Sequence, residues 1–188
     1  ANGDVNANKL SNGTKDLFRF KVTAVNSDIA LWKFNFDIST TVAVVSNLYV
    51  YDVTDPSNDL VLNATAGNAD TKVWETVGSD WTGSGIIGTQ VVVSKTTPRT
   101  FVLRGNIASA GTGASVSVRV AGDAVFLTGA ASGVGMSAAA TVDSDLHDDF
   151  IWSDKNASGH TVSTADWTNG YLVSGLSSLS TSAETVSY

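Results

Sequence analysis

Aspartate clusters are the first feature of this sequence that could do chemistry. The densest places four carboxylates within seven residues, at Asp143, Asp145, Asp148 and Asp149. Carboxylates this close repel one another unless a cation or water screens them. Calcium takes six to eight oxygen ligands, which loops rich in Asp and Asn supply. The cluster predicts a calcium site, and the alternative is a set of ordinary turn-forming aspartates.

A second acidic group surrounds the turn at Pro56. Its carboxylates are Asp52, Asp55 and Asp59. The same oxygen-ligand argument makes this turn a second candidate calcium site. Calcium is therefore the one cofactor that the sequence suggests.

Residues with the chemistry of catalysis are scarce. A Ser-His-Asp triad needs a histidine, and only His147 and His160 are present, neither with a Gly-x-Ser-x-Gly nucleophile motif in the chain. We expect both to be solvated loop residues. A glycosidase needs two opposed carboxylates, one in an apolar setting, and the two glutamates are Glu75 and the late Glu184. The sequence therefore predicts a protein that is not an enzyme.

Aromatic side chains offer an alternative kind of binding site. Many carbohydrate-binding modules are β-sandwiches that present coplanar aromatic rings to the faces of sugars. The candidates here are Trp74, Trp81, Trp152, Trp167 and Tyr171. Tryptophans also fill the core and corners of sandwiches, so a carbohydrate-binding or adhesive module with glycan partners stays the alternative function.

The elements that position these residues are predicted to be strands. In the segment 17–24, Phe18, Phe20 and Val22 alternate with polar residues, and in 30–38 apolar residues from Trp32 to Ile38 do the same. Further strands are predicted at 42–53, 60–63, 72–77, 86–94, 100–107, 115–120, 124–127, 150–152 and 171–173. Turns rich in Gly, Asn and Pro separate them, including one at 82–85. The expected fold is an all-β antiparallel sandwich, jelly-roll or immunoglobulin-like, with little or no helix.

The two ends of the chain differ in composition from the predicted sandwich, which spans 16–175. Residues 1–15 are polar and predict an N-terminal arm, and the Ser-rich residues 176–188 predict a C-terminal tail. Either could add a strand to the sheet of a neighbouring subunit. The apolar residues that would then mediate assembly are Val5, Leu10, Leu176, Leu179, Val186 and Tyr188.

Composition narrows the remaining classes of function. Of the 188 residues only 15% are charged, about a quarter are Ser or Thr, and the net charge is −7. Eleven scattered basic residues do not form the cationic surface that nucleic-acid binding needs. Without cysteine there is no disulfide or zinc–thiolate site, and no apolar run is long enough for a transmembrane helix.

The start of the sequence favours an extracellular or cell-surface location. It begins at Ala1 without Met, as a chain does after removal of a signal peptide. Three Asn-x-Ser/Thr sequons stand at Asn12, Asn63 and Asn156.

Several segments resemble secreted surface proteins of small-genome candidate-phylum bacteria. They are the strand patterns at 17–24 and 31–38, the segments 149–154 and 165–173, and 100–105. In broad character the chain is also similar to β-sandwich subunits of extracellular filaments, such as biofilm fibres, archaeal bundling pili and threads, and calcium-containing cannulae. These resemblances imply an exported sandwich that polymerises with copies of itself by donor-strand addition, and they bring no catalytic residues.

Overall fold

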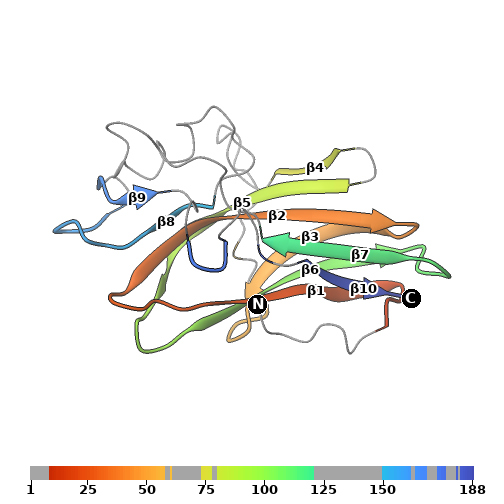
Figure 1. Ribbon diagram of the computed structural model, residues 1–188, viewed down its shortest axis with the longest axis horizontal. Coiled ribbons are helices and arrows are strands. Elements are labelled where there is room, and N and C mark those ends of the chain that lie inside the picture. Colours follow the sequence, from red (N-terminus) through yellow and green to blue (C-terminus); the bar gives the residue numbers. More distant parts are fainter. Residues whose placement is uncertain are drawn as a thin grey trace.

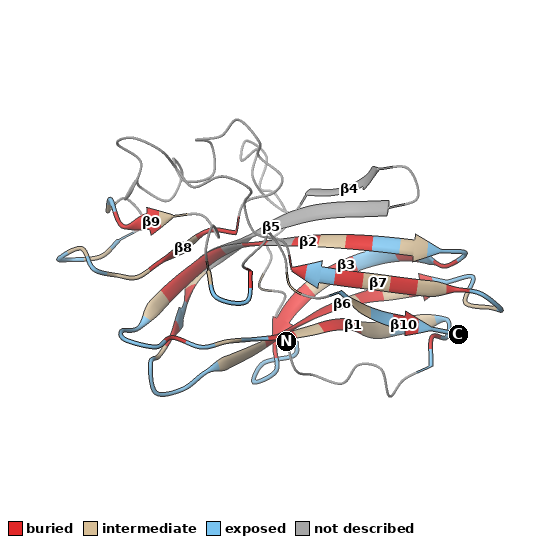
Figure 2. Ribbon diagram, viewed as in Figure 1, coloured by how far each residue is buried: buried red, intermediate tan, exposed pale blue. Residues whose placement is uncertain are grey.

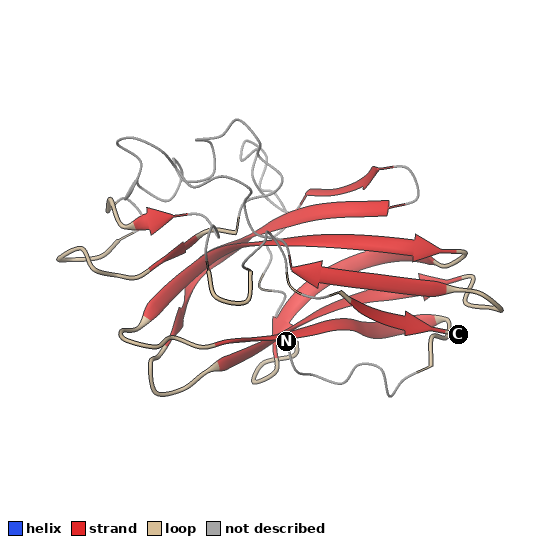
Figure 3. Cartoon of the chain, in the orientation of Figure 1, coloured by secondary structure: helices blue, strands red, loops and turns tan. Residues whose placement is uncertain are grey.

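Strands make up all the regular structure in the part of the chain that the computed structural model describes, which is residues 9–57, 60, 73–77, 80–120, 150–161, 164–168, 173–176, 181 and 183–188 (Figure 3). The strands are β1 (Gly13–Val22), β2 (Ile29–Thr41), β3 (Val44–Asp52), β4 (Val73–Val77), β5 (Asp80–Val93), β6 (Arg99–Ala108), β7 (Ser115–Val120), β8 (Trp152–Ser153), β9 (Trp167–Thr168) and β10 (Glu184–Ser187). The predicted all-β antiparallel fold is confirmed. Over the same residues, no helix combines the length and the apolar character needed to cross a bilayer.

The strands form two sheets (Figure 1). Sheet A has the order β1-β6-β3, and sheet B has the order β10-β7-β2-β5-β4, with β8 paired to β2 and β9 to β8. All of these pairings are antiparallel. Because β2 and β3 are consecutive but belong to different sheets, the short link between them forms a corner of the sandwich-like fold.

Phenylalanines from both sheets form the centre of the core. Phe20 of β1 and Phe101 of β6 come from sheet A, and Phe34 of β2 comes from sheet B. The ring centroid of Phe34 lies 5.2 Å from that of Phe20 and 5.1 Å from that of Phe101. Each buried Phe contributes on the order of 2–3 kcal/mol through the apolar area it removes from water. The predicted inward face of the two strongest strand patterns is thus confirmed, and the buried residues appear in red in Figure 2.

The segment 82–85 lies inside β5, so the turn predicted there is wrong. Gly83 is paired with Phe36 and Gly85 with Phe34 across β2. A glycine opposite a large ring leaves it room on the pleated surface, and such cross-strand pairing offsets the weak strand preference of Gly. The sequence pattern alone shows the glycines and not the rings opposite them.

One glycine in sheet A is required by close packing. A Cβ atom at Gly105 in β6 would lie 3.0 Å from a methyl carbon of Leu17 and 3.0 Å from one of Leu48. These two leucines belong to the neighbouring strands β1 and β3 and are buried. The position therefore admits no side chain without displacement of the core.

Candidate functional site

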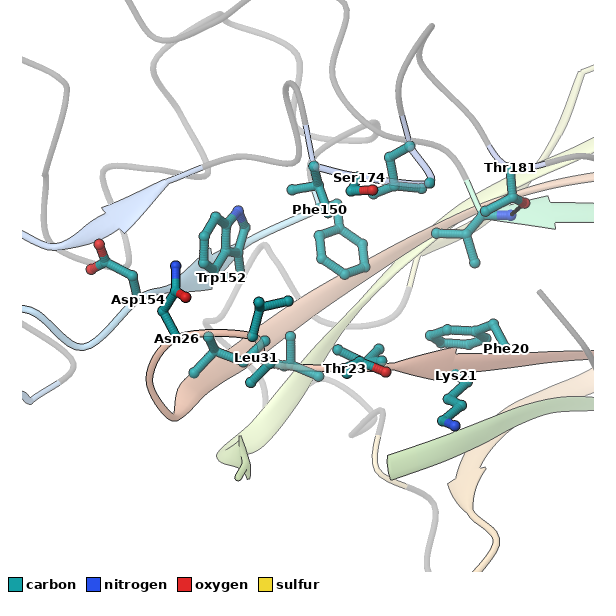
Figure 4. A pocket seen from close by; sticks show the side chains of 18 of the residues that line it. Phe20, Lys21, Thr23, Asn26, Leu31, Phe150, Trp152, Asp154, Ser174 and Thr181 are labelled. Atoms are coloured by element: carbon teal, nitrogen blue, oxygen red, sulfur yellow. Dashed lines mark hydrogen bonds between the residues drawn. The ribbon is translucent and has the colours of Figure 1, made fainter. Parts of the chain in front are cut away.

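A groove of about 610 Å³ opens between the two sheets (Figure 4). One wall is the second half of β1 and the loop after it, and the other is formed by the segments around β8 and residues 173–176. In Figure 4, Trp152 and Phe150 face Leu31 and Thr23 across it. The lining is mainly apolar, and its charged residues are one cation and one anion, Lys21 and Asp154.

Pairing with β2 holds the wall around β8 in place. Trp152 of β8 lies opposite Leu31. The backbone N–H of Trp32 donates to the carbonyl of Ile151 at 3.0 Å. Trp152 remains half-buried while the neighbouring Phe150 is buried in the core. The wall is therefore anchored to sheet B while one indole is partly accessible from the groove.

The outer edge of β1 runs along the opposite wall. β1 pairs with β6 on one side, from Gly13 opposite Ile107 to Val22 opposite Arg99. Within the described ranges, no backbone hydrogen bond joins residues 20–26 to a strand on the other side. A free edge beside an apolar groove is the arrangement to which an extended chain can add.

Several residues expected to mediate assembly lie in the core of the same chain. Leu10, Leu176 and Val186 are all buried, and only Tyr188 is exposed. The backbone N–H of Leu10 donates to the carbonyl of Ser187 at 2.9 Å, and the ammonium of Lys9 lies 4.3 Å from the ring centroid of Tyr188. The expected arm 1–15 and tail 176–188 thus overlap the sandwich. Val5 and Leu179 lie outside the described residues.

The last strand of the sequence completes one edge of sheet B. β10 pairs with β7 from Glu184 opposite Val118 to Ser187 opposite Ser115. The hydroxyl of Thr185 donates to that of Ser117 at 3.0 Å, and the N–H of Thr181 donates to the carbonyl of Val120 at 2.9 Å. The Ser-rich composition of this segment gave little sign of a strand, apart from the alternation of Val186 and Tyr188.

Among the predicted calcium ligands, Asp52 has protein partners for both carboxylate oxygens. It accepts hydrogen bonds from the backbone N–H and hydroxyl of Thr54 at 2.8 and 2.7 Å, and from Nε of Arg99 at 2.6 Å. Burial by itself raises the pKa of Asp52, but these hydrogen bonds outweigh it and hold the pKa below the ordinary value. The guanidinium supplies the positive charge that calcium was expected to supply.

Of the other predicted calcium ligands only Asp55 is described, and its backbone N–H donates to the carbonyl of Asp52 at 2.9 Å. Asp55 accepts a hydrogen bond from the hydroxyl of Ser57 at 3.0 Å. Asp59 and the whole cluster Asp143, Asp145, Asp148 and Asp149 lie outside the described residues. In the described part of the chain, no three acidic or histidine side chains gather as a metal site would require.

The side chain of His160 is only 7% exposed, and the prediction of a solvated loop residue was wrong. Its Nδ1 lies 2.7 Å from a carboxylate oxygen of Asp166 and its Nε2 2.9 Å from the amide oxygen of Gln90, 70 residues away. Its ring packs on Trp167 with centroids 5.2 Å apart. Because Gln90 belongs to β5, this contact fixes the loop around His160 to that strand. The Nε2 atom faces an amide, whereas a catalytic triad would place a hydroxyl there.

Asp166 is the charged centre of this loop cluster. Burial by itself raises the pKa of Asp166, but hydrogen bonds from Thr164, His160 and the backbone N–H of Ala157 outweigh burial and lower it. The indole N–H of Trp167 donates to the carbonyl of Thr161 at 3.1 Å. Apart from Gln90, the members of this cluster lie close together in the chain, between residues 157 and 167, and sequence reasoning missed them because it assigned His160 to a solvated turn.

Two of the predicted sugar-binding aromatics have described side chains, Trp152 and Trp167. Trp167 is fully buried in β9. Trp74 lies in β4 and Trp81 in β5, where they are paired with Gly83 and Thr76 respectively. Tyr171 lies outside the described residues. Of the two described side chains, Trp152 lines the groove.

A polar network on sheet A was not predicted. Arg104 donates from Nε to Asp16 at 2.5 Å and from its two terminal nitrogens to the hydroxyls of Tyr49 at 3.0 Å and Tyr51 at 2.7 Å. Burial and the hydrogen bond to Asp16 raise the pKa of Tyr51 to about 12. The tyrosines at alternate positions of β3 were the available signal. The network ties the three strands of sheet A together.

Comparison with protein-family models, with characterised proteins and with solved structures gives no match for this chain. What the protein does is therefore inferred from its own geometry. The features available are the groove beside β1, the edge strand β10 and the distribution of exposed apolar side chains.

Proposed function

We propose that the chain is a non-enzymatic structural subunit of an extracellular filament, tube or surface layer, in which copies assemble by exchange of a β-strand. The observation that carries the proposal is the position of β10, which is the last of the described strands and completes an edge of sheet B through β7. A neighbour's copy of the same strand can form the same contacts, so exchange costs little in free energy.

Packing of an apolar side chain stabilises β10 at the edge of β7 in every copy. Val186 is 4% exposed and adds to the core beside Val116 and Val118 of β7. Loss of the strand would uncover this part of the core and leave β7 with an unpaired edge. An incoming strand from another copy restores both.

The chain preceding β10 is long enough for exchange. Twelve residues, 169–180, separate Thr168 at the end of β9 from Thr181 beside Val120. Fully extended, this stretch reaches about 43 Å, whereas the six residues of β7 span only about 20 Å, and full extension draws the buried Leu176 out of its own core. A strand could therefore cross to an adjacent copy while β9 stays with its own sandwich.

Composition supports a surface suited to assembly. Only 15% of residues are charged, so like charges on adjacent copies are few. The absence of cysteine in the sequence also makes engineered cysteines unambiguous reporters of strand position.

The test uses two chains that carry one cysteine each, Ser117→Cys and Thr185→Cys, mixed before assembly. These positions lie opposite one another in β7 and β10, so a disulfide between different chains forms if β10 is exchanged. The matched control is the mixture of Thr14→Cys and Asn106→Cys, which face each other in β1 and β6. We expect covalent dimers in the first mixture and none in the second, together with polymers in negative-stain micrographs.

The outcomes against the proposal are equally definite. A wild-type chain that stays monomeric at all concentrations is not a self-assembling subunit. Polymers whose Ser117→Cys and Thr185→Cys chains never cross-link assemble by some other contact than exchange of β10.

Glycan binding is the second candidate function, and one observation favours it. Trp152 is half-buried in the groove, and Asn26 and Asp154 lie in the same lining. An accessible indole beside amide and carboxylate groups is suited to stacking on a sugar ring and bonding its hydroxyls. Robust binding of the monomer on a glycan array, abolished by Trp152→Ala, would favour this function.

A further inference from the structure

Sheet A has an edge that is open to the groove. β1 is the outer strand of the order β1-β6-β3, and no described strand pairs with its other side. Residues from Phe20 to Ala24 on this edge line the groove, and Phe150 and Trp152 lie across from them (Figure 4). Alternate residues of an edge strand direct their N–H and C=O groups away from the sheet. These groups are the ones to which an added strand bonds.

The two faces of this edge differ in character. Phe20 is buried and faces the core, whereas Arg19 and Lys21 alternate with it and face outward. Among the described residues, neither of these two cations forms an ion pair. A strand that adds here therefore needs an apolar face toward the core and a polar or acidic face on the other side.

The segment 1–8 has this pattern in its sequence. Its odd positions are apolar or glycine and its even positions are polar: Ala1, Gly3, Val5 and Ala7 alternate with Asn2, Asp4, Asn6 and Asn8. Alternation with a period of two is the pattern of a strand with one apolar face. The apolar side chains are small, and the only charged side chain is an acid. The segment thus matches both faces of the open edge.

The position of Leu10 shows where this segment joins the fold. Leu10 is buried, and its N–H donates to the carbonyl of Ser187 at 2.9 Å. Ser187 is paired with Ser115, the first residue of β7, at the end of the fold where the C-terminus lies in Figure 1. β1 begins at this end, and the groove lies toward its other end, beside the loop that leads to β2.

The reach of the chain decides which copy the segment can serve. Val5 precedes Leu10 by five residues and lies within about 18 Å of it, even if the chain is fully extended. The length of β1 from Gly13 to Phe20 is about 23 Å. Val5 therefore cannot lie against the part of β1 that lines the groove of its own copy. Only a second copy can bring Val5 there.

We propose that residues 1–8 of one copy add as a strand to the open edge of β1 in the groove of another copy. This inference rests on the proposed function, because it requires copies of the chain to associate. In the added strand, Val5 extends the core face beside Phe20, and Asp4 extends the outer face beside Arg19 and Lys21. Opposite charges on neighbouring strands stabilise the pairing.

The contact has a direction that suits a polymer. The segment leaves one end of the fold and the groove lies toward the other, so the two contact surfaces are different. A contact of this kind is heterologous and repeats from copy to copy without closure. A strand of a few residues binds weakly by itself. When an exchanged β10 already joins two copies, the segment binds at a high effective concentration and adds to the stability of the polymer.

The test detects the segment of one chain on the surface of another. Asn6→Cys introduces the only cysteine of the chain, and a nitroxide spin label is attached to it. The labelled chain is mixed, below the concentration at which polymers form, with wild-type chain enriched in ¹⁵N. We expect paramagnetic broadening of the amide signals of residues 19–25 and of the indole N–H of Trp152. The enriched chain is wild type in every mixture, so its fold is the same throughout.

Variants of the spin-labelled chain test the two faces of the added strand. Val5→Asp should reduce the relaxation enhancement about tenfold, because it brings a charge to the apolar face. Asn8→Asp adds the same charge to the polar face, is the matched control and should leave the enhancement within about twofold. Asp4→Lys should reduce it about two- to fivefold, and more at low salt, because it opposes Arg19 and Lys21.

The possible failures are distinguishable. Absence of broadening at 19–25, or equal effects of Val5→Asp and Asn8→Asp, would overturn this inference. A groove that binds a glycan and shows no broadening belongs to the second candidate function. Cross-links between Ser117→Cys and Thr185→Cys without broadening leave strand exchange standing and refute the added strand. Broadening without those cross-links supports the added strand and refutes exchange of β10.

Discussion

Replacement of Asp52 by Asn tests whether the end of β3 is held by an ion pair. The side chain of Asp52 is 2% exposed, whereas that of Arg99 is 33% exposed. Asp52→Asn removes the charged acceptor of one hydrogen bond from Arg99 and weakens two from Thr54. Since hydrogen bonds to charged groups contribute about 1.5–3 kcal/mol and Arg99 keeps part of its hydration, we expect a loss of about 2–3 kcal/mol in the free energy of unfolding.

A double-mutant cycle with Arg99→Met isolates the pair. Urea unfolding at pH 7, followed by tryptophan fluorescence, gives the free energy for the wild type, the two single variants and the double variant. We expect a coupling of about 1–2 kcal/mol between the two positions. A loss below about 0.5 kcal/mol for Asp52→Asn, or a coupling near zero, would refute the ion-pair account. Stabilisation of the wild type by calcium that Asp52→Asn abolishes would instead support the metal site predicted from the sequence.

Three further outcomes can be checked. The pKa values of Asp52 and Asp166 are lowered in the fold. Their contribution to the free energy of unfolding is therefore present above the unfolded-state pKa of about 3.9 and is lost as pH falls through the lower folded values. The Tm should fall on acidification below about pH 4, and less steeply in Asp52→Asn. Gly105→Ala should destabilise by about 1–3 kcal/mol in urea, because its Cβ would crowd two leucines, whereas Gly111→Ala, with open space around its Cβ, should be neutral within about 0.5 kcal/mol. A calcium site at the cluster containing Asp145 predicts a higher Tm in millimolar calcium than in EDTA, lost in Asp145→Asn; equal Tm values in the wild type would exclude it.

The sequence predicted the core strands because their chemistry is local. Phe18, Phe20, Phe34 and Phe36 alternate with polar residues, and a period of two fixes which face is buried without knowledge of the partner strand. The strand 115–120 was predicted with the bounds that the structure has. In these elements each residue's own preference for a strand and for burial agrees with its place in the fold.

What the sequence did not predict depends on partners far away in the chain. The strand character of 82–85 arises from Phe34 and Phe36 in β2, more than 40 residues earlier. The burial of His160 depends on Gln90. Likewise, β10 exists because β7 offers an edge, and its own Ser-rich sequence would not form a strand in isolation.

The groove and the exposed valines at the ends of the strands could not be predicted for the same reason. Val25, Val42 and Val92 are unremarkable valines in the sequence, and only the register of β2 with its neighbours places them at opposite ends of the fold. Register is set by pairing across the whole sheet and not by local composition.

The pairing of strands distant in the sequence has a consequence for timing. Sheet A joins residues from 13–22, 44–52 and 99–108. In sheet B, one edge of β7 stays unpaired until residues 184–187 add to it. Topologies dominated by such non-local pairing fold slowly, because the chain loses entropy in closing long loops before any stabilising contact forms. While this edge of β7 is unpaired, another partly folded chain can supply the missing strand if the protein concentration is high. The concentration at which chains fold, more than the stability of the finished monomer, would then decide whether each one closes on itself or joins a chain of others.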